Sequence, residues 1–136
     1  MKIDGGCHCG NITFVAEIDP DKVRICHCTD CQTQTGSAFR TNVPAAKDAI
    51  TMRGGQPKIY IKTVESGSKR AQAFCPECGT PIDSAAAGDP QFFMIRVGTV
   101  RQRAALRPKS QQWCRSALDW VMDLRSVNQI AKQQTS

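Results

Sequence analysis

Seven of the eight cysteines in the sequence fall into three short clusters whose residue types and spacing suit metal binding. The clusters are Cys7-His8-Cys9, then Cys26-His27-Cys28-Thr29-Asp30-Cys31, and finally Cys75-Pro76-Glu77-Cys78. In a reducing compartment, clustered cysteines more often bind a metal or take part in chemistry than form disulfides. Residues 1–10 lack the apolar stretch of a secretory signal peptide, so we expect a cytoplasmic protein with free thiols.

The first and third clusters supply two pairs of ligands for one closed site. Tetrahedral zinc, with Zn–S bonds of about 2.3 Å, holds its sulfurs about 3.8 Å apart, so a structural site usually takes two ligands from each of two short turns. The pair Cys7 and Cys9 and the pair Cys75 and Cys78 are each followed by a glycine, which can adopt the positive φ of such a turn. We therefore predict a structural zinc on these four cysteines.

The second cluster leaves three ligands and one open position. Cys26, Cys28 and Cys31 are the number of protein ligands that a zinc site uses when it also binds a substrate or water. Three thiolates on Zn²⁺ give a net charge of −1, which makes a poorer Lewis acid than a site of three neutral histidines. A small thiol could bind there as a thiolate although a free thiol has a pKa of about 8.5. The cluster therefore favours thiol chemistry over hydrolysis.

Four residues near the clusters allow other interpretations. Cys114 is the eighth cysteine and could close the second site as a fourth ligand, but we predict that it is a small buried side chain. His8 and His27 each stand between two cysteines, and we expect their side chains to point away from the metals. Asp30 is predicted to be an exposed carboxylate in a turn, although it could orient a group near the second zinc.

Periodicity of the apolar residues predicts a domain made mainly of β-strands. Ile12, Phe14, Ala16 and Ile18 alternate with other residues, the period of a half-buried strand. Turn signals rich in Gly, Pro, Asp and Ser separate further predicted strands at 23–26, 38–43, 50–53, 58–64, 70–74 and 92–97. Many short strands at close spacing predict an all-β domain.

The C-terminal part of the sequence has a different pattern. Trp113, Ala117, Trp120, Val121 and Leu124 recur at helical spacing, which predicts a short helix that packs its tryptophans on a sheet edge. We expect one folded domain over residues 1–125 and a polar tail over 126–136.

Length, composition and charge narrow the classes of function. The 136 residues, 40% of them hydrophobic and 22% charged, fit one globular domain, and no apolar run approaches the length of a membrane span. The formal charge of +6 leaves nucleic acid open as a partner, but seven thiolates and two Zn²⁺ would lower it to about +3. We therefore do not expect a membrane or nucleic acid as a partner. A loose basic run is predicted to form a solvated face: Arg96, Arg101, Arg103, Arg107, Lys109 and Arg115.

Together these motifs resemble a known family. The segments Gly6-Cys-His-Cys-Gly10, Cys26-His-Cys-x-x-Cys31 and Phe74-Cys-x-x-Cys-Gly79 resemble the glutathione-dependent formaldehyde-activating enzymes, a family that also contains the centromere protein V domain. The resemblance also includes Gly36-Ser37 with Phe39, residues 54–60, Val97-Gly98-Thr99 and Trp120. It runs in order from about residue 4 to residue 120, nearly the whole predicted domain.

The resemblance implies a fold and a set of zinc ligands. It implies an Mss4-like fold of several coiled, antiparallel β-sheets, with a structural zinc on the residues at Cys7, Cys9, Cys75 and Cys78. A second zinc would be held by Cys26, Cys28 and Cys31, which makes two Zn²⁺ per chain. The sequence departs from many members after Cys31, where Gln32 and Thr33 stand in place of basic residues, and at 108–113, which lacks a histidine.

The resemblance also implies an activity. Family members are carbon–sulfur lyases that join glutathione to formaldehyde and give S-hydroxymethylglutathione. We therefore expect a cytoplasmic zinc enzyme that joins a small thiol, glutathione or a similar one, to formaldehyde or a related aldehyde. The alternatives are a carrier of glutathione adducts and a non-enzymatic zinc module that binds nucleic acid or protein.

Overall fold

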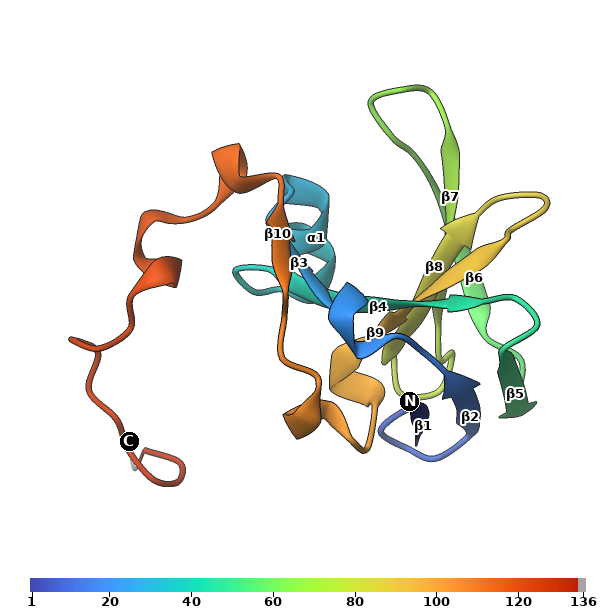
Figure 1. Cartoon of the computed structure of the whole chain (residues 1–136), viewed down its shortest axis with the longest axis horizontal. Helices are drawn as coiled ribbons and strands as arrows, with labels where there is room; N and C mark the ends of the chain where they lie inside the picture. The colour runs from blue at the N-terminus through green and yellow to red at the C-terminus, as the bar shows by residue number, and fades with distance from the viewer. Residues whose placement is uncertain (135–136) are drawn as a thin grey trace.

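Two β-sheets make up the body of the protein (Figure 1). The computed structural model describes residues 1–134. The smaller sheet has three antiparallel strands in the order β1-β2-β5, formed by Lys2–Gly6, Ile12–Glu17 and Ile50–Gly54. In β2 the buried residues Ile12, Phe14 and Ala16 alternate with exposed ones, as the sequence pattern predicts.

The larger sheet has seven strands in the order β10-β3-β4-β9-β8-β7-β6. All neighbouring strands are antiparallel except β10 and β3, which are parallel. The strands are β3 (Arg24–Cys26), β4 (Arg40–Ala46), β6 (Lys58–Thr63), β7 (Lys69–Phe74), β8 (Pro81–Ala86), β9 (Phe92–Arg96) and β10 (Ser110–Gln112). The all-β prediction is confirmed, while β1, β8 and β10 are strands that the sequence analysis did not predict.

Short helices connect the strands. The one α-helix among the described residues is α1 (Thr29–Thr35), which begins inside the second cysteine cluster and ends at Gly36 in the left-handed conformation. The 3₁₀ turns are η1 (Pro20–Lys22), η2 (Val97–Thr99), η3 (Arg103–Ala105), η4 (Cys114–Ser116) and η5 (Asp119–Met122).

The C-terminal segment differs from the predicted amphipathic helix. Two separate turns, η4 and η5, replace one continuous helix, and the segment extends away from the sheets in Figure 1. Trp113 and Trp120 are 43% and 56% exposed, so they do not pack on a sheet edge. A helix of about 12 residues is marginal in water unless it buries its apolar face. Here Trp113, Trp120 and Leu124 of that face are exposed.

The hydrophobic core joins the two sheets. Ile12 and Phe14 of β2, Val43 of β4 and Ile95 of β9 are almost completely buried in one cluster. The same cluster includes the cysteines Cys7 and Cys75, so one candidate metal site borders the core itself.

Ile95 tests the role of this core in stability. Its side chain is fully buried on a central strand, whereas Ile59 of β6 is 48% exposed. Because Ile95→Ala leaves a cavity, we expect it to lower the free energy of unfolding by about 3 kcal/mol. Ile59→Ala should cost less than about 1 kcal/mol. Urea unfolding of the zinc-loaded variants measures both values, and equal losses would contradict the assignment of the core.

Candidate metal centre and the adjoining cavity

The first candidate metal site brings together cysteines from two distant parts of the chain. Cys7 and Cys9 lie between β1 and β2, and Cys75 and Cys78 lie between β7 and β8. The register of β7 shifts between Ala73 and Phe74, just before the second pair. All four sulfurs lie within 4.8 Å of one another, so the structure brings together the four cysteines predicted to bind the structural zinc.

Tight backbone turns hold these sulfurs close together. Gly10 and Gly79 have φ of 82° and 77°, and each closes its turn by donating a backbone hydrogen bond, to the carbonyls of Cys7 and Cys75. The Sγ–Sγ distances are 3.6 Å from Cys7 to Cys9 and 3.8 Å from Cys9 to Cys75. These distances match the spacing of about 3.8 Å that tetrahedral zinc imposes, so the four thiols fit a closed zinc site.

Hydrogen bonds at two of these four sulfurs, those of Cys7 and Cys78, favour the thiolate form that a metal requires. The backbone N–H of Ile12 donates to Cys7 Sγ at 3.2 Å. The hydroxyl of Thr80 lies 3.2 Å from Cys78 Sγ and is the main cause that lowers the pKa of this thiol, to about 5.

The second candidate site has three sulfurs. Cys26 ends β3, Cys28 precedes α1 as its N-cap, and Cys31 lies in the first turn of that helix. The backbone N–H of Cys31 donates to Cys28 Sγ at 3.3 Å, and all three sulfurs lie within 4.8 Å of one another. They therefore fit three ligands of one zinc ion.

Without a cation, these sulfurs can hold little negative charge. The Cys31 thiol donates a hydrogen bond that lowers the pKa of Cys26 to about 5, and the thiolate at Cys26 raises the pKa of Cys31. The nearby Arg40 guanidinium acts on Cys31 in the opposite direction. A divalent cation would allow all three to be thiolates together, because its charge removes their mutual repulsion.

The fourth position is not filled by the eighth cysteine. Cys114 is exposed and lies outside the three-sulfur group, so the prediction that it is buried is wrong. It lines a different cavity, of about 610 Å³, together with His27. Among residues 1–134, the structure adds no histidine or carboxylate to either group of sulfurs.

Neither His8 nor His27 belongs to a group of candidate metal ligands. His8 is exposed. His27 is buried, its Nε2 lies 2.7 Å from Oε1 of Gln111, and its ring meets Phe39 edge to face. Gln32 Nε2 donates to the His27 carbonyl and to that of Ser116, so the residue after Cys31 has a structural role here.

A cavity of about 790 Å³ lies beside the second site. It lies between α1, which contributes Asp30, Thr33 and Gln34, and the sheet formed by β4, β6, β7 and β9. Cys31 lies between these helical residues in α1, and Cys26 is the register partner of Arg40, which lines the cavity. This volume falls in the range of about 300–1,000 Å³ that small-molecule sites occupy.

Cationic side chains line this cavity. Arg40 and Arg96 are only 5% and 7% exposed, and Arg96 donates to Oδ1 of Asn42 at 2.8 Å and to Oε1 of Gln72 at 2.6 Å. Burial, and next the charge of Arg40, lower the pKa of Arg96 to about 9, which still leaves it protonated at neutral pH. Lys62 of β6 also lines the cavity, and its Nζ donates to Oδ2 of Asp30 in α1 at 3.0 Å.

The basic run divides into one buried residue and five exposed ones. Arg101, Arg103, Arg107, Lys109 and Arg115 are exposed, as the predicted solvated face requires. For Arg96 that prediction is wrong, because β9 places its side chain against β4 and β7. Asp30 is exposed as predicted, and Lys62 binds it.

Arg40 and Gln72 are site residues that the sequence analysis missed. One signal was present in the sequence: Arg40 and Asn42 are two residues apart in a strand and therefore share a face. The partners that make this face a site come from the non-local pairing of β4 with β9, which no local pattern specifies.

Comparison with known proteins decides the family. The family model described as glutathione-dependent formaldehyde-activating enzyme matches residues 2–116. The chain belongs to this family. The resemblance carried by the three cysteine clusters is thereby confirmed.

A curated relative supports the same family. A protein of Halomonas elongata, which carries the provisional name of a glutathione-dependent formaldehyde-activating enzyme, is 27% identical over 86 residues. The match covers 60% of this chain and 55% of that protein, so the chain spans about half the length of this relative.

A solved structure has the same fold. A crystal structure of a Rhodobacter sphaeroides protein is similar with a TM-score of 0.60 and 17% sequence identity, over 79% of this chain and 98% of that one. The fold expected for a glutathione-dependent formaldehyde-activating enzyme, several antiparallel sheets with cysteine clusters that could hold zinc, is therefore confirmed. Within residues 1–134, no helix has both the length and the apolar character to cross a membrane.

Metal analysis of cysteine variants tests the two sites separately. We expect two zinc ions per wild-type chain, because two groups of sulfurs fit the metal. Cys31→Ser should lose one zinc and keep its circular dichroism, whereas Cys75→Ser should lose the fold, because Cys75 is fully buried in the core.

The matched control is Cys114→Ser, which should keep both zinc ions because Cys114 lies outside both groups. Zinc content measured by mass spectrometry of the purified variants, beside thermal unfolding, separates these outcomes. Loss of the second zinc from Cys114→Ser would contradict the three-cysteine site.

Proposed function

We propose that the chain joins glutathione to formaldehyde at the Cys26, Cys28 and Cys31 site and forms S-hydroxymethylglutathione, which makes it a carbon–sulfur lyase. The observation that carries the proposal is a group of three sulfurs, one short of a tetrahedron, beside a cavity lined by cations. The family supports glutathione and formaldehyde as the substrate pair. A related thiol or aldehyde would use the same site.

Each cluster has a separate task in this proposal. Cys7, Cys9, Cys75 and Cys78 would hold a structural zinc that ties the two sheets together. Cys26, Cys28 and Cys31 would hold the second zinc and leave one position open. When bound there, Zn²⁺ would lower the pKa of a thiol so that it is available as a thiolate near neutral pH.

The reaction is an addition to a carbonyl group. The thiolate sulfur attacks the carbon of formaldehyde, a carbon–sulfur bond forms, and the C=O π bond breaks. The oxygen then takes a proton from water. This proton balances the one that the thiol released to water when it became a thiolate. Because thiols add to formaldehyde without a catalyst, the contribution of the protein is to hold the two reactants together in a suitable orientation.

A cytoplasmic location fits this chemistry. A reducing compartment keeps clustered cysteines as thiols that can bind metal, and both clusters consist of free cysteines in the structure.

Exchange between formaldehyde and its glutathione adduct tests the proposal. Magnetisation-transfer NMR measures the exchange rate with the zinc-loaded full chain, and we expect a rate above the uncatalysed one. Cys28→Ser should reduce the acceleration by at least about tenfold, because it removes one of three ligands from the site.

Cys114→Ser is the matched control and should exchange at the wild-type rate, because Cys114 is exposed and outside the site. No acceleration by fully metallated wild-type protein would reject catalysis. If that protein still bound the adduct, it would be a carrier, and salt-dependent binding to DNA or RNA would instead support a nucleic-acid module.

A further inference from the structure

The cavity beside the second site contains buried positive charge without a carboxylate partner. None of the ion pairs among residues 1–134 includes Arg24, Arg40, Arg70 or Arg96. The Nε atoms of Arg24, Arg40 and Arg96 are buried and have no hydrogen-bond partner. A buried charge without a partner is costly, so this arrangement calls for an anion that the chain does not supply.

Strand register directs this charge to the same face as a cysteine of the second site. Cys26 of β3 lies opposite Arg40 of β4, and Asn42 lies opposite both Arg24 and Arg96. Residues that face each other across paired strands point to the same side of the sheet, as do residues two apart in one strand. The guanidinium groups and the Cys26 sulfur therefore share one polar face.

Two carboxylates come near these arginines, and neither neutralises them on this face. Asp83 of β8 is the register partner of Ile95, so it points to the opposite, apolar face, where it lines a cavity with Ala73 and Ala85. Burial raises the pKa of Asp83 to about 6, against the opposing effect of Arg96. Asp30 is exposed and bound by Lys62 at 3.0 Å.

The thiolates of the second site would balance only part of the charge. Three thiolates with Zn²⁺ carry a net charge of −1, whereas Arg40 and Arg96 together carry +2. One positive charge is left over in the cavity. Their hydrogen bonds to Gln34, Asn42 and Gln72 use only some of the Nη–H groups, and because each Nη carries two hydrogens, both guanidinium groups keep further Nη–H groups to donate.

We propose that Arg40 and Arg96 bind a carboxylate of the thiol substrate and make the cavity selective for thiols that carry one. Guanidinium groups pair strongly and directionally with carboxylates. The bound carboxylate supplies the missing anion and holds the thiol with its sulfur toward Cys26, Cys28 and Cys31. This inference rests on the proposed function for its substrate, but binding can be measured without the reaction.

Comparison of an acid with its ester tests the site in the unaltered protein. The probes are S-methylglutathione, whose sulfur is blocked, and its diethyl ester, which has no carboxylate. Titration calorimetry with the zinc-loaded full chain should show that the acid binds at least about tenfold more tightly, the effect of one charge-assisted hydrogen bond. Equal affinities for acid and ester, or no binding of the acid, would overturn the proposal.

Variants then assign the effect to residues. Arg96→Gln and Arg40→Gln should each weaken binding of the acid about tenfold to a hundredfold and leave the affinity for the ester unchanged. Arg96→Lys keeps the charge but loses the fork of donors, so its loss should be smaller. Zinc content and thermal unfolding identify a variant that has lost its fold, and the acid–ester ratio of the wild type stands independently of any variant.

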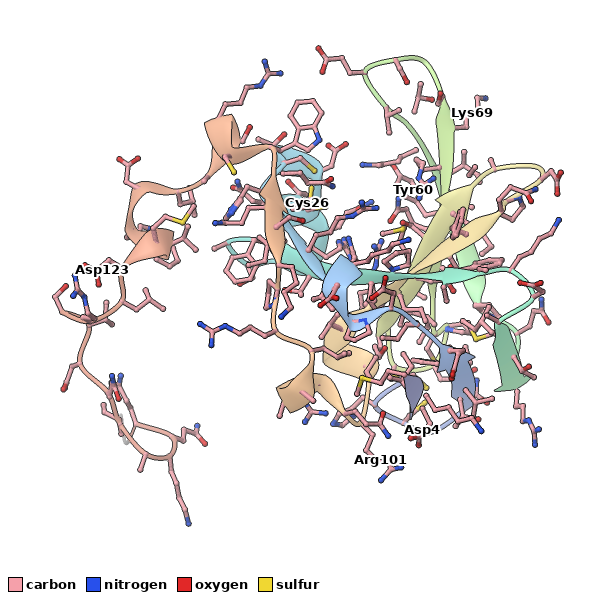
Figure 2. All side chains as sticks on the ribbon, in the orientation of Figure 1. Asp4, Cys26, Tyr60, Lys69, Arg101 and Asp123 are labelled. Atoms are coloured by element: carbon pink, nitrogen blue, oxygen red, sulfur yellow. The ribbon has the colours of Figure 1, made fainter. Side chains whose placement is uncertain are left out.

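Arg101→Gln is the matched control. Arg101 is exposed, pairs with Asp4 at 2.8 Å, and lies far from Cys26 in Figure 2. Its removal should leave the acid–ester ratio at the wild-type value. A loss as large as that of Arg96→Gln would show a general effect of charge and overturn the assignment to the cavity.

Failure of this proposal differs from failure of the proposed function. Selective binding of the acid by a wild-type protein that does not accelerate adduct exchange would keep the carboxylate site and reject the enzyme. Acceleration of exchange with equal affinity for acid and ester would keep the enzyme and reject the carboxylate site.

Discussion

The convergence of Cys7 and Cys9 with Cys75 and Cys78 is the constraint on which the rest of the structure depends. It joins the turn after β1, in the small sheet, to the turn between β7 and β8, in the large one, across more than sixty residues of chain. Cys7 and Cys75 are themselves buried in the core between the sheets. A metal there would compensate the loop-closure entropy of this long connection, which a core of modest size in a 136-residue chain compensates only in part. With the fold held by the first group of sulfurs in this way, the second group would be free to leave one position open to a ligand.

The two faces of the large sheet have different roles. One face carries Val43 and Ile95 into the core, and the other carries Arg40, Asn42 and Arg96 toward the cavity and the second cysteine cluster. Burying guanidinium groups costs stability, and the hydrogen bonds to Asn42 and Gln72 offset only part of that cost. A protein selected for stability alone would fill this face with apolar side chains. Its polar character is therefore best explained by a ligand, and the rigid strands fix the guanidinium groups before that ligand arrives.

The grouping of the candidate metal ligands is easier to predict from the sequence than the strands and turns around them. Metal ligands are recognisable because a tetrahedral ion needs cysteines at short spacing, so Cys26, Cys28 and Cys31 could be grouped from local pattern alone. Strand β2 was equally predictable from its period of two, whereas β8, with Ser84 and Asp83 buried among alanines, carries no such signal. Local sequence could not distinguish the buried Arg96 from the exposed Arg101, because both belong to one basic run. Arg96 is buried through the pairing of β9 with β4, which is not local in sequence. Periodicity also failed for the segment after Trp113, because an amphipathic pattern makes a helix only where a surface covers its apolar face.

The formal charge of the sequence does not describe the surface of the protein, because several arginines lie in the interior. A formal charge of +6 would suit a surface that binds nucleic acid, but Arg40 and Arg96 are buried and Arg24 and Arg70 are only partly exposed. These four side chains contribute to an interior potential beside the cysteines, not to an outer patch. On the outside, three of the exposed arginines are paired with carboxylates: Arg101 with Asp4, Arg115 with Glu65 and Arg125 with Asp123. Part of the excess of basic over acidic side chains is therefore placed where a small anionic ligand would meet it. That distribution favours a small-molecule site over an extended polyanion, because a polyanion is bound by charge that lies along a surface.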